Sequence, residues 1–408
     1  MSNFATDAEV ARWRADTPGS ERHVHLNNAG AGLMTQIVLD VMKAHLDAEA
    51  LDGGYEAAQD NASRIAAAYD SVARLCGAQA HNVAFIENAT AGVALILSTF
   101  AWKPGDRIVT TRNDYASNQI MMLSLAQRYG VEILRARDLD EGGADPDDFA
   151  RLLESNRVKL ALVTWVPTNS GLIQPVVELG ARCVAAGIPY AIDACQAAGQ
   201  LPIDVSELRC DYLTASARKF LRGPRGIGFL YAADRMLNAG YHPLFADMRG
   251  ADWTHVDAFE LKPDARRFEN WEFAYALVLG MGAAADYAMA AGQERTSARA
   301  RSLAANLREG LAAIQGVRVL DRGRELAAIV SFEPGTAEPA AVVKRLHERG
   351  INASWTPRTS ATIDLDEKGA AAIVRLSPHY YNTDAEIGRA VEEVAALVGG
   401  SRALRARS

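Results

Sequence analysis

Short apolar runs alternate with longer amphipathic stretches over the first two-thirds of the chain. Seven of these runs have the length and composition of buried strands: 83–86, 107–111, 131–135, 160–166, 190–193, 212–215 and 228–231. Helical patterns lie between most of them, as in 90–100, 117–129 and 175–186. Alternating strands and helices predict a mainly parallel sheet with helices on both faces, and strands this apolar suit burial on both sides. The predicted fold class is therefore α/β, with a seven-stranded, mainly parallel sheet.

The pattern changes after about residue 251. A linker rich in charged and aromatic residues leads into a long helix from Trp271, and a smaller α+β region follows. Its expected elements are a strand at 327–332, a helix at 339–349, a strand at 372–376 and a helix at 384–398. A chain of 408 residues exceeds what one hydrophobic core usually supports. We therefore expect a large domain over 20–255 and a smaller α+β domain from 1–19 and 256–408, which includes the interdomain helix.

Charge and cysteine content disfavour several classes of protein. Forty-three Lys and Arg against fifty Asp and Glu leave a net charge of −7, which argues against a generally basic nucleic-acid binder. The four cysteines include no CxxC pair, so neither a disulfide framework nor a structural zinc site is predicted. His23 and His25 have ligand-like spacing, but no acidic or Cys cluster accompanies them, and no metal site is expected.

The amino-terminal stretch and one long apolar stretch bear on location. The first residues are polar and mixed in charge, without the apolar core of a secretory signal. The stretch 273–291 is apolar, but it contains Asp286 and much of it is Ala and Gly. A membrane span needs roughly 20 strongly apolar residues, so a helix buried between domains is the better interpretation. We expect a cytoplasmic protein without a membrane partner.

Residues that can bind or react with a ligand follow three of the predicted strands. Doubly wound sheets bind their ligands at these carboxyl ends of the strands. The turn at 88–92 opens a helix whose free N–H groups suit an anion, although an ordinary helix cap has the same residues. Asp193 ends a second strand, where a carboxylate is costly unless a partner neutralises it. Lys219 follows the next strand beside a loop rich in Gly and Arg, where its amine is either a nucleophile or a surface charge.

Together the three sites suit pyridoxal 5'-phosphate. Its phosphate needs a helix N-terminus, its ring nitrogen needs a carboxylate, and its aldehyde needs a lysine. A longer series of motifs occurs in the same order along the chain: Asn28-Ala29-Gly30, Asn88-Ala89-Thr90, Tyr115-Ala116-Ser117-Asn118, Pro167-Thr168-Asn169-Ser170-Gly171, Asp193-Ala194-Cys195-Gln196, 216–219 and 375–383. With this series the chain resembles the fold-type I, class V aminotransferases over roughly residues 20–400. The stretch 217–231 is most similar to the branch of isopenicillin-N-epimerase-like proteins and ergothioneine-pathway C–S lyases.

The resemblance implies a role for each matching residue. Lys219 would be the catalytic residue and would carry the internal aldimine with the cofactor. Asp193 would pair with the ring nitrogen, Gln196 would contact the phenolic oxygen, and Tyr115 would stack on the ring. Many relatives have His where this chain has Arg218. The rest of the implied cofactor-binding set comprises Asn88, Ala89, Thr90, Ser216 and Arg218 around the phosphate, with Thr168 or Asn169 facing the cofactor or the substrate.

The resemblance also extends to substrate and partner. Arg375 would clamp the α-carboxylate of an amino-acid substrate, since a planar guanidinium suits bidentate recognition. Asn28 belongs to the same substrate-binding set. Family members are usually homodimers with active sites at the interface, and the same assembly is expected here. Arg266 or Arg267 would then either reach the partner's site or remain a charge of the linker.

The sequence leaves the reaction open. Once the Lys219 amine removes the α-proton, transamination, β-elimination with C–S cleavage and epimerisation diverge from one carbanion. Aminotransferase or C–S lyase activity on an amino acid is the leading hypothesis, and epimerase or racemase activity is the alternative. A non-catalytic scaffold with this fold is a further alternative, but the joint presence of Lys219, Asp193 and Arg375 argues against it. The sequence contains no P-loop, dinucleotide fingerprint or GxSxG elbow.

Cysteine placement argues against one branch of the family. Cysteine desulfurases in it carry a reactive thiolate on a mobile loop upstream of the position that Arg375 occupies. Here the span 350–374 has no Cys, and all four cysteines lie between 76 and 210. We interpret Cys195, two residues after Asp193, as a packing residue near the cofactor, because free Cys is usually buried and inert. The sequence thus predicts an enzyme that is not a cysteine desulfurase.

Overall fold

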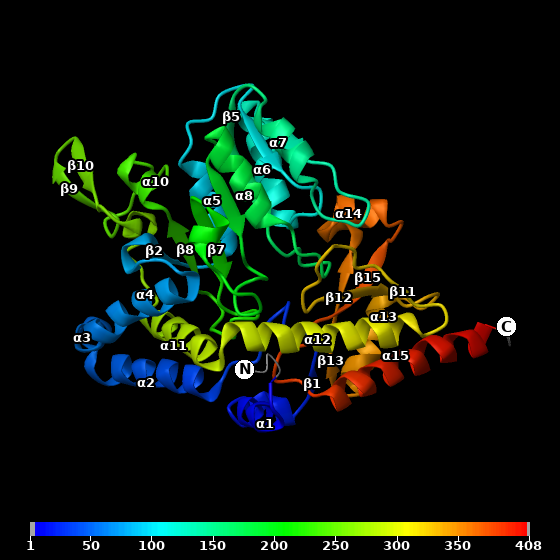
Figure 1. Ribbon diagram of the computed structural model, residues 1–408. Coiled ribbons are helices and arrows are strands. Elements are labelled where there is room, and N and C mark those ends of the chain that lie inside the picture. The colour runs from blue at the N-terminus through cyan, green and yellow to red at the C-terminus, as the bar shows by residue number, and fades with distance from the viewer. Residues whose placement is uncertain (1–4, 406–408) are drawn as a thin grey trace.

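A seven-stranded sheet forms the centre of the larger part of the molecule in the computed structural model, which describes residues 5–405 (Figure 1). Along the chain the strands are β2 (Val83–Ile86), β3 (Arg107–Thr110), β4 (Glu132–Arg135), β5 (Val158–Thr164), β6 (Tyr190–Asp193), β7 (Tyr212–Ser216) and β8 (Gly228–Ala232). Their order in the sheet is β2-β8-β7-β6-β5-β3-β4. Strands β4, β3, β5, β6 and β7 are parallel, and β8 is antiparallel to both neighbours. The predicted mainly parallel sheet is confirmed.

Side chains of each strand alternate between two faces, and each face is covered by its own helices. Leu160 and Leu162 of β5 belong to one core cluster with residues of α5 (Ala89–Ser98) and α6 (Ala116–Tyr129). Ala161 and Val163 belong to the opposite cluster. The helices that supply this second cluster include α4 (Ala62–Cys76), α7 (Pro146–Leu153), α8 (Val176–Ala186) and α11 (Tyr275–Ala291).

The helices begin and end at residues suited to those positions. The Asp145 side chain caps α7 by accepting from the Asp147 and Asp148 N–H groups. Helices α6 and α8 end at Gly130 and Gly187, both with the left-handed backbone that favours glycine. Two shorter helices in this part are α9 (Val205–Leu208) and α10 (Asp234–Asn238).

The smaller part contains an antiparallel sheet of four strands in the order β11-β12-β15-β14. These strands are β11 (Arg318–Val319), β12 (Val330–Glu333), β14 (Ser354–Pro357) and β15 (Ala372–Leu376). Helices α13 (Pro339–Glu348), α14 (Thr362–Glu367) and α15 (Asp384–Arg405) complete it. The α+β pattern expected here is confirmed: the strand 372–376 matches β15, the helices 339–349 and 384–398 correspond to α13 and α15, and the expected strand 327–332 begins three residues before β12.

Two consecutive helices join the larger and smaller parts. Helix α11 packs on α2 (Gln36–Asp52) and α4, and it ends at Gly292, whose φ of 84° breaks the helical path. The next helix, α12 (Gln293–Ala312), runs from beneath the large sheet to the smaller part (Figure 1). The stretch 273–291 is therefore mostly a packed helix, as expected from its sequence.

The amino-terminal segment joins the smaller part rather than the large sheet. In α1 (Asp7–Ala15), Trp13 packs edge-on against Tyr380 at a ring-centroid distance of 4.9 Å. Strand β1 (Val24–His25) pairs with β13 (Ile351–Asn352) in parallel. Between β1 and the sheet lie α2 and α3 (Gly54–Asp60). The domain boundaries given above remain predictions.

One unpredicted element lies in the supposed linker. Strands β9 (Ala251–His255) and β10 (Ala258–Leu261) form a hairpin that projects from the body of the molecule (Figure 1). Trp253 is 80% exposed and Val256 is 85% exposed, so the hairpin buries little of its apolar surface. Apolar and polar residues alternate only over short runs such as 251–254, which lie among the charged and aromatic residues of the expected linker, so no strand is predicted there.

Candidate active site

A cavity of about 270 Å³ opens where β6 and β7 end and α5 begins. Eight of the residues expected to bind the cofactor line it: Asn88, Ala89, Thr90, Tyr115, Asp193, Ser216, Arg218 and Lys219. Four further residues complete the lining: Glu87, Cys195, Arg225 and Gly226. Residues far apart in the sequence meet here because the carboxyl ends of parallel strands lie along one edge of the sheet.

One end of this cavity is built to receive an anion. Asn88 caps α5 through its side-chain oxygen, which accepts from the Ala91 N–H at 2.9 Å. The Ala89 N–H donates to the Ser216 hydroxyl oxygen at 3.0 Å. The N-terminus of α5 adds the positive end of its dipole. In residues 5–405 neither Arg218 nor Arg225, which line the same cavity, forms an ion pair with a carboxylate.

Asp193 ends β6 as a carboxylate that is only 2% exposed. Its Oδ2 accepts from Asn118 Nδ2 at 2.9 Å, and its Oδ1 accepts from the Cys195 N–H at 2.9 Å. No Lys, Arg or His in the described part of the chain forms an ion pair with it. A buried carboxylate without a cation is unfavourable, so the site favours a ligand that supplies a positive charge there.

Lys219 lies in the same cavity and is 6% exposed. Its Nζ lies 5.7 Å from the centroid of the Tyr115 ring and has no carboxylate partner among residues 5–405. The amine and the Asp193 carboxylate therefore share a cavity without pairing with each other. A molecule with a protonated ring nitrogen at one end, an aldehyde beside Lys219 and a phosphate at the α5 N-terminus satisfies all three groups. The residues present thus fit pyridoxal 5'-phosphate.

Arg375 on β15 is a third buried charge without a counter-ion in the described residues, after Asp193 and Lys219. It is 7% exposed, and its NH1 donates to the Thr168 carbonyl oxygen at 2.7 Å and to the Thr168 hydroxyl at 2.8 Å. Its NH2 donates to Asn27 Oδ1 at 3.4 Å, while its Nε is buried without a partner in the described residues. Burial, with Arg218 nearby, lowers the pKa of Arg375 to about 10. Such a guanidinium suits a carboxylate ligand.

Gln196 connects Thr168, which holds this guanidinium, to the segment 27–30. Its Nε2 donates to the Thr168 hydroxyl at 2.8 Å and to the Ala29 carbonyl oxygen at 3.0 Å. Its Oε1 is buried and has no partner in the described residues. Neither Gln196 nor Thr168 lines the Lys219 cavity directly. Their hydrogen bonds place both between Arg375 and the segment 27–30.

Two expected site residues use their side chains elsewhere. Asn28 Nδ2 donates to the Ser377 carbonyl oxygen at 2.8 Å, and Asn28 Oδ1 accepts from the Tyr381 hydroxyl at 2.7 Å. Asn169 Nδ2 donates to Asp364 Oδ2 at 2.7 Å, in the smaller part. Asn27, which the motif comparison did not single out, is the asparagine that contacts Arg375. In a pair of adjacent asparagines, sequence alone does not tell which side chain points where.

The two arginines considered for a partner's site differ in their surroundings. Arg267 is buried and donates to the carbonyl oxygens of Lys262, Leu237 and Tyr241, so its side chain is committed within its own chain. These contacts favour Arg266 over Arg267 as the residue that reaches a partner, and both assignments stay predictions. Arg266 is half-exposed and pairs with Asp264 at 2.6 Å.

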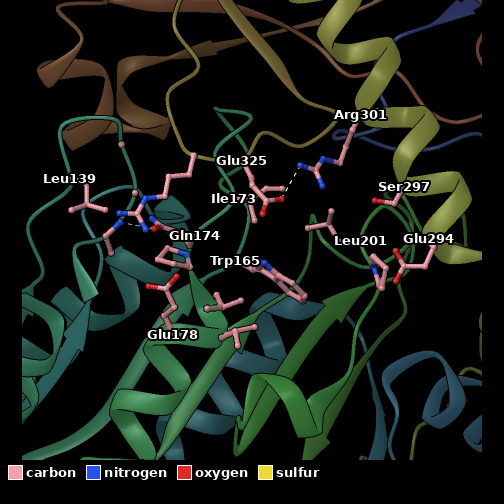
Figure 2. A pocket seen from close by; sticks show the side chains of 18 residues that line it. Leu139, Trp165, Ile173, Gln174, Glu178, Leu201, Glu294, Ser297, Arg301 and Glu325 are labelled. Atoms are coloured by element: carbon pink, nitrogen blue, oxygen red, sulfur yellow. Dashed lines mark hydrogen bonds and ion pairs between the residues drawn. The ribbon is translucent and has the colours of Figure 1, made fainter. Parts of the chain in front are cut away.

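A second cavity, of about 360 Å³, lies between α8, α12 and the chain near Glu325 (Figure 2). Apolar side chains such as Trp165, Ile173 and Leu201 form much of its wall. Arg301 on α12 pairs with Glu325 at 2.8 Å beside it (Figure 2). It shares no lining residue with the Lys219 cavity, and no Lys, Cys or His lines it. It therefore offers no nucleophile of the kind found beside Asp193.

No helix between residues 5 and 405 combines the length and apolar character needed to cross a membrane. Over the same residues, no group of three or more His, Cys, Asp or Glu side chains is arranged to hold a metal ion.

Comparisons with known proteins agree with this site. The sequence model of the family described as "Aminotransferase class-V" matches residues 24–389. A probable cysteine desulfurase of Methanothermobacter thermautotrophicus is 26% identical, over 94% of this chain and 98% of its own length. A probable hercynylcysteine sulfoxide lyase of Mycobacterium tuberculosis is 27% identical, over 97% of this chain and 95% of its own length. The apo structure of a cysteine desulfurase from Thermococcus onnurineus, 25% identical, has a TM-score of 0.87 and covers 98% of this chain and 100% of that one.

The match over most of the chain shows the family. The chain belongs to the class-V aminotransferases, with the fold-type I architecture that the motif series implied. It is an enzyme that depends on pyridoxal 5'-phosphate, and the unpaired Asp193 and Lys219 are consistent with that cofactor.

Proposed function

We propose that this enzyme cleaves a C–S bond in an amino acid by β-elimination. The observation that carries the proposal is the buried pair of Lys219 and Asp193, which line one cavity yet remain unpaired within the described residues. The choice of a C–S bond is supported by relatives named as cysteine desulfurases and as a sulfoxide lyase. Aminotransferase activity is the alternative that the experiment below separates.

The side chains divide the work of binding and proton transfer. Arg375 binds the α-carboxylate, because its guanidinium is buried beside Thr168 with no internal anion. The Lys219 amine takes the proton from Cα. When bound, pyridoxal phosphate supplies an electron sink for the electron pair left at Cα. Asp193 holds the proton on the ring nitrogen. The sulfur then leaves from Cβ with the electron pair of the broken C–S bond.

The cofactor-binding roles are likewise proposals. Ala89, Thr90, Ser216 and Arg218 hold the phosphate, supported by the N-terminus of α5 that opens beside them, with Asn88 as its cap. Tyr115 covers the ring, which fits the 5.7 Å between its ring centroid and Lys219 Nζ. Gln196 contacts the phenolic oxygen. Of Thr168 and Asn169, we assign Thr168 to the substrate side of the site, because it makes two hydrogen bonds with Arg375 whereas the Asn169 side chain donates to Asp364.

We also propose that the enzyme is not a cysteine desulfurase, although several relatives bear that name. All four cysteines are buried, and burial raises the pKa of the Cys76, Cys183 and Cys210 thiols. The span upstream of Arg375 contains no Cys and instead forms α14, whose Asp364 accepts from Asn113 and Asn169. A thiolate on a mobile loop has no counterpart in that span.

A homodimer with active sites at the interface is the proposed assembly. Support comes from large apolar side chains left exposed on and near the β9–β10 hairpin: Leu244, Phe245, Met248, Trp253, Val256 and Phe259. Exposed apolar surface of this kind commonly marks a protein–protein contact. Arg266, which is half-exposed beside this hairpin in the sequence, is the remaining candidate to reach the partner's site.

A substrate screen tests the proposed reaction. The holoenzyme is incubated with S-substituted cysteines and with simple amino acids, each with and without a keto-acid acceptor. β-Elimination yields a keto acid, ammonia and a thiol from the S-substituted cysteines without any acceptor. A requirement for the acceptor, with no thiol released, would favour an aminotransferase and contradict the proposal.

A further inference from the structure

Asn118 lies between the buried carboxyl groups of Asp114 and Asp193, the second of which lines the cofactor cavity. It belongs to the first turn of α6 and is fully buried. Its Nδ2 donates to Asp193 Oδ2 at 2.9 Å and to Thr164 Oγ1 at 3.2 Å, and Asp114 Oδ1 lies 3.5 Å away. We propose that Asn118 is a positioning residue that fixes the Asp193 carboxylate in the orientation required by the ring nitrogen of the cofactor. The inference rests on the role proposed above for Asp193.

The orientation of the Asn118 amide is itself determined by charge. Its Nδ2 faces acceptors only, whereas its Oδ1 is buried without a partner in the described residues. Turning the amide round would place its oxygen against two carboxyl groups and remove the donor from Asp193. A buried oxygen without a donor is unfavourable, and such groups are few in folded proteins. Its presence here indicates that the contact with Asp193 determines the conformation.

Neighbouring side chains hold this amide from behind. Thr164 ends β5 and is the direct partner of Asp193 across the β5–β6 pair. The Thr164 hydroxyl also hydrogen-bonds to Asp114. Asp114 in turn accepts from the Thr110 hydroxyl at 2.9 Å and from the Tyr115 N–H at 2.6 Å. Asn118 is thus tied to two adjacent strands and to the residue whose ring adjoins Lys219.

The geometry gives Asp193 one donor on each carboxylate oxygen. The Cys195 N–H holds Oδ1, and Asn118 holds Oδ2. Loss of the Asn118 donor leaves one oxygen unheld, so the carboxylate can rotate away from the ring nitrogen. Without a well-placed Asp193 carboxylate, the ring nitrogen would be protonated to a smaller extent, and the ring would withdraw electrons less strongly. The Lys219 nitrogen bonded to the cofactor would then be more basic. The visible absorbance of the bound cofactor should then titrate at a higher pH.

The test compares Asn118→Leu with a matched control, Asn113→Leu. Both asparagines are buried in the same segment, but the Asn113 amide donates to Asp364 at 3.0 Å and does not contact Asp193. In the holoenzyme without substrate, Asn118→Leu should raise the absorbance pKa by about one unit. It should also weaken cofactor binding about tenfold, as expected for a hydrogen bond to a charged group. The control should titrate like the wild type even if it unfolds at a lower temperature.

Thr164→Val and the double variant of Asp193→Ala with Asn118→Leu test whether Asn118 acts through Asp193. Thr164→Val removes the hydroxyl that accepts from Asn118, and it should raise the absorbance pKa by less than Asn118→Leu does. This variant provides the test if Asn118→Leu does not fold. In an Asp193→Ala background, Asn118→Leu should add nothing, because it acts through Asp193. Two outcomes would overturn the role of Asn118 but leave that of Asp193 intact. In one, the absorbance pKa shifts in Asp193→Ala but in neither Asn118→Leu nor Thr164→Val. In the other, the shifts of Asn118→Leu and Asp193→Ala are fully additive. An unshifted Asp193→Ala holoenzyme would instead overturn the proposed role of Asp193.

Discussion

Arg375 shows how a single residue can indicate the chemistry of a substrate. A buried guanidinium is unfavourable without an anion, and the described part of the chain gives Arg375 only neutral oxygens from Thr168 and Asn27. Burial, followed by the nearby charge of Arg218, lowers the pKa of Arg375 to about 10. A substrate carboxylate would supply the missing anion.

Replacing Arg375 by Ala should therefore penalise substrates according to their carboxylate. A hydrogen-bonded charged contact contributes about 1.5–3 kcal/mol, so kcat/KM for α-amino acids should fall roughly 10- to 100-fold or more. The corresponding amines, which lack the carboxylate, should lose much less. Steady-state kinetics on matched amino-acid and amine pairs provide the measurement. Equal losses for both would show that Arg375 is structural.

Cys195 lines the cofactor cavity, yet the proposed chemistry does not use it. Its N–H holds Asp193 through the backbone, so Cys195→Ala should keep that contact and most of the activity. With L-cysteine, the wild-type enzyme should form no protein-bound persulfide. Mass spectrometry after exposure to cysteine is the measurement. A stable added sulfur on any of the four cysteines, with alanine released in step, would identify a desulfurase.

At the scale of elements, α14 docks on the larger part through a charged cluster. Arg112 pairs with Glu367, Lys368 pairs with Asp364 at 2.7 Å, and Asn113 and Asn169 also donate to Asp364. Asp138, near this cluster, has a buried Oδ1 without a partner in the described residues. Burial, together with the nearby Glu367, raises the pKa of Asp138 to about 6.

The raised pKa makes the effect of Asp138→Asn depend on pH. Between about pH 4 and pH 6 the folded protein holds a proton that the unfolded chain has lost, so wild-type stability falls as pH rises through this window. Asn mimics the protonated form at every pH. The variant should gain stability over the wild type above pH 6, by about 1–3 °C in Tm after allowance for screening by water. At pH 4 the wild type and the variant should have the same Tm. Thermal melts between pH 4 and pH 8 are the measurement. The same difference in Tm at every pH would contradict the raised pKa of Asp138.

Strands and helices with a clear apolar run or period are predictable from the sequence, whereas short elements without such a pattern are not. Strand β6 was predicted over the same residues that the structure shows, because its run is short, apolar and ended by Asp193. The hairpin β9–β10 and helix α14 were missed because they are short: β9 has 5 residues, β10 has 4 and α14 has 6, too few for a clear period. In the site, Lys219 and Asp193 follow from strand ends. The contact of Asn27 with Arg375 needed the fold.

At the scale of the whole molecule, the exposed apolar surface around the hairpin tests the proposed dimer. Phe245 is 84% exposed, and a charge there should prevent association if this surface is the interface. Phe245→Glu should shift the enzyme from dimer to monomer in analytical ultracentrifugation. Val184→Glu, at an exposed apolar position on α8, is the matched control and should remain dimeric. A wild-type monomer, or a dimer that survives Phe245→Glu, would argue against this interface.

The most direct test of the central claim is to identify the lysine that holds the cofactor. Lys219 is the lysine that lines the cavity with Asp193, and its amine has no carboxylate partner in residues 5–405. Borohydride reduction of the holoenzyme, followed by peptide mass spectrometry, should place the reduced pyridoxyl group on the peptide containing Lys219, and Lys219→Ala should abolish the label. A label on any other lysine, or none on a fully loaded enzyme, would contradict the account.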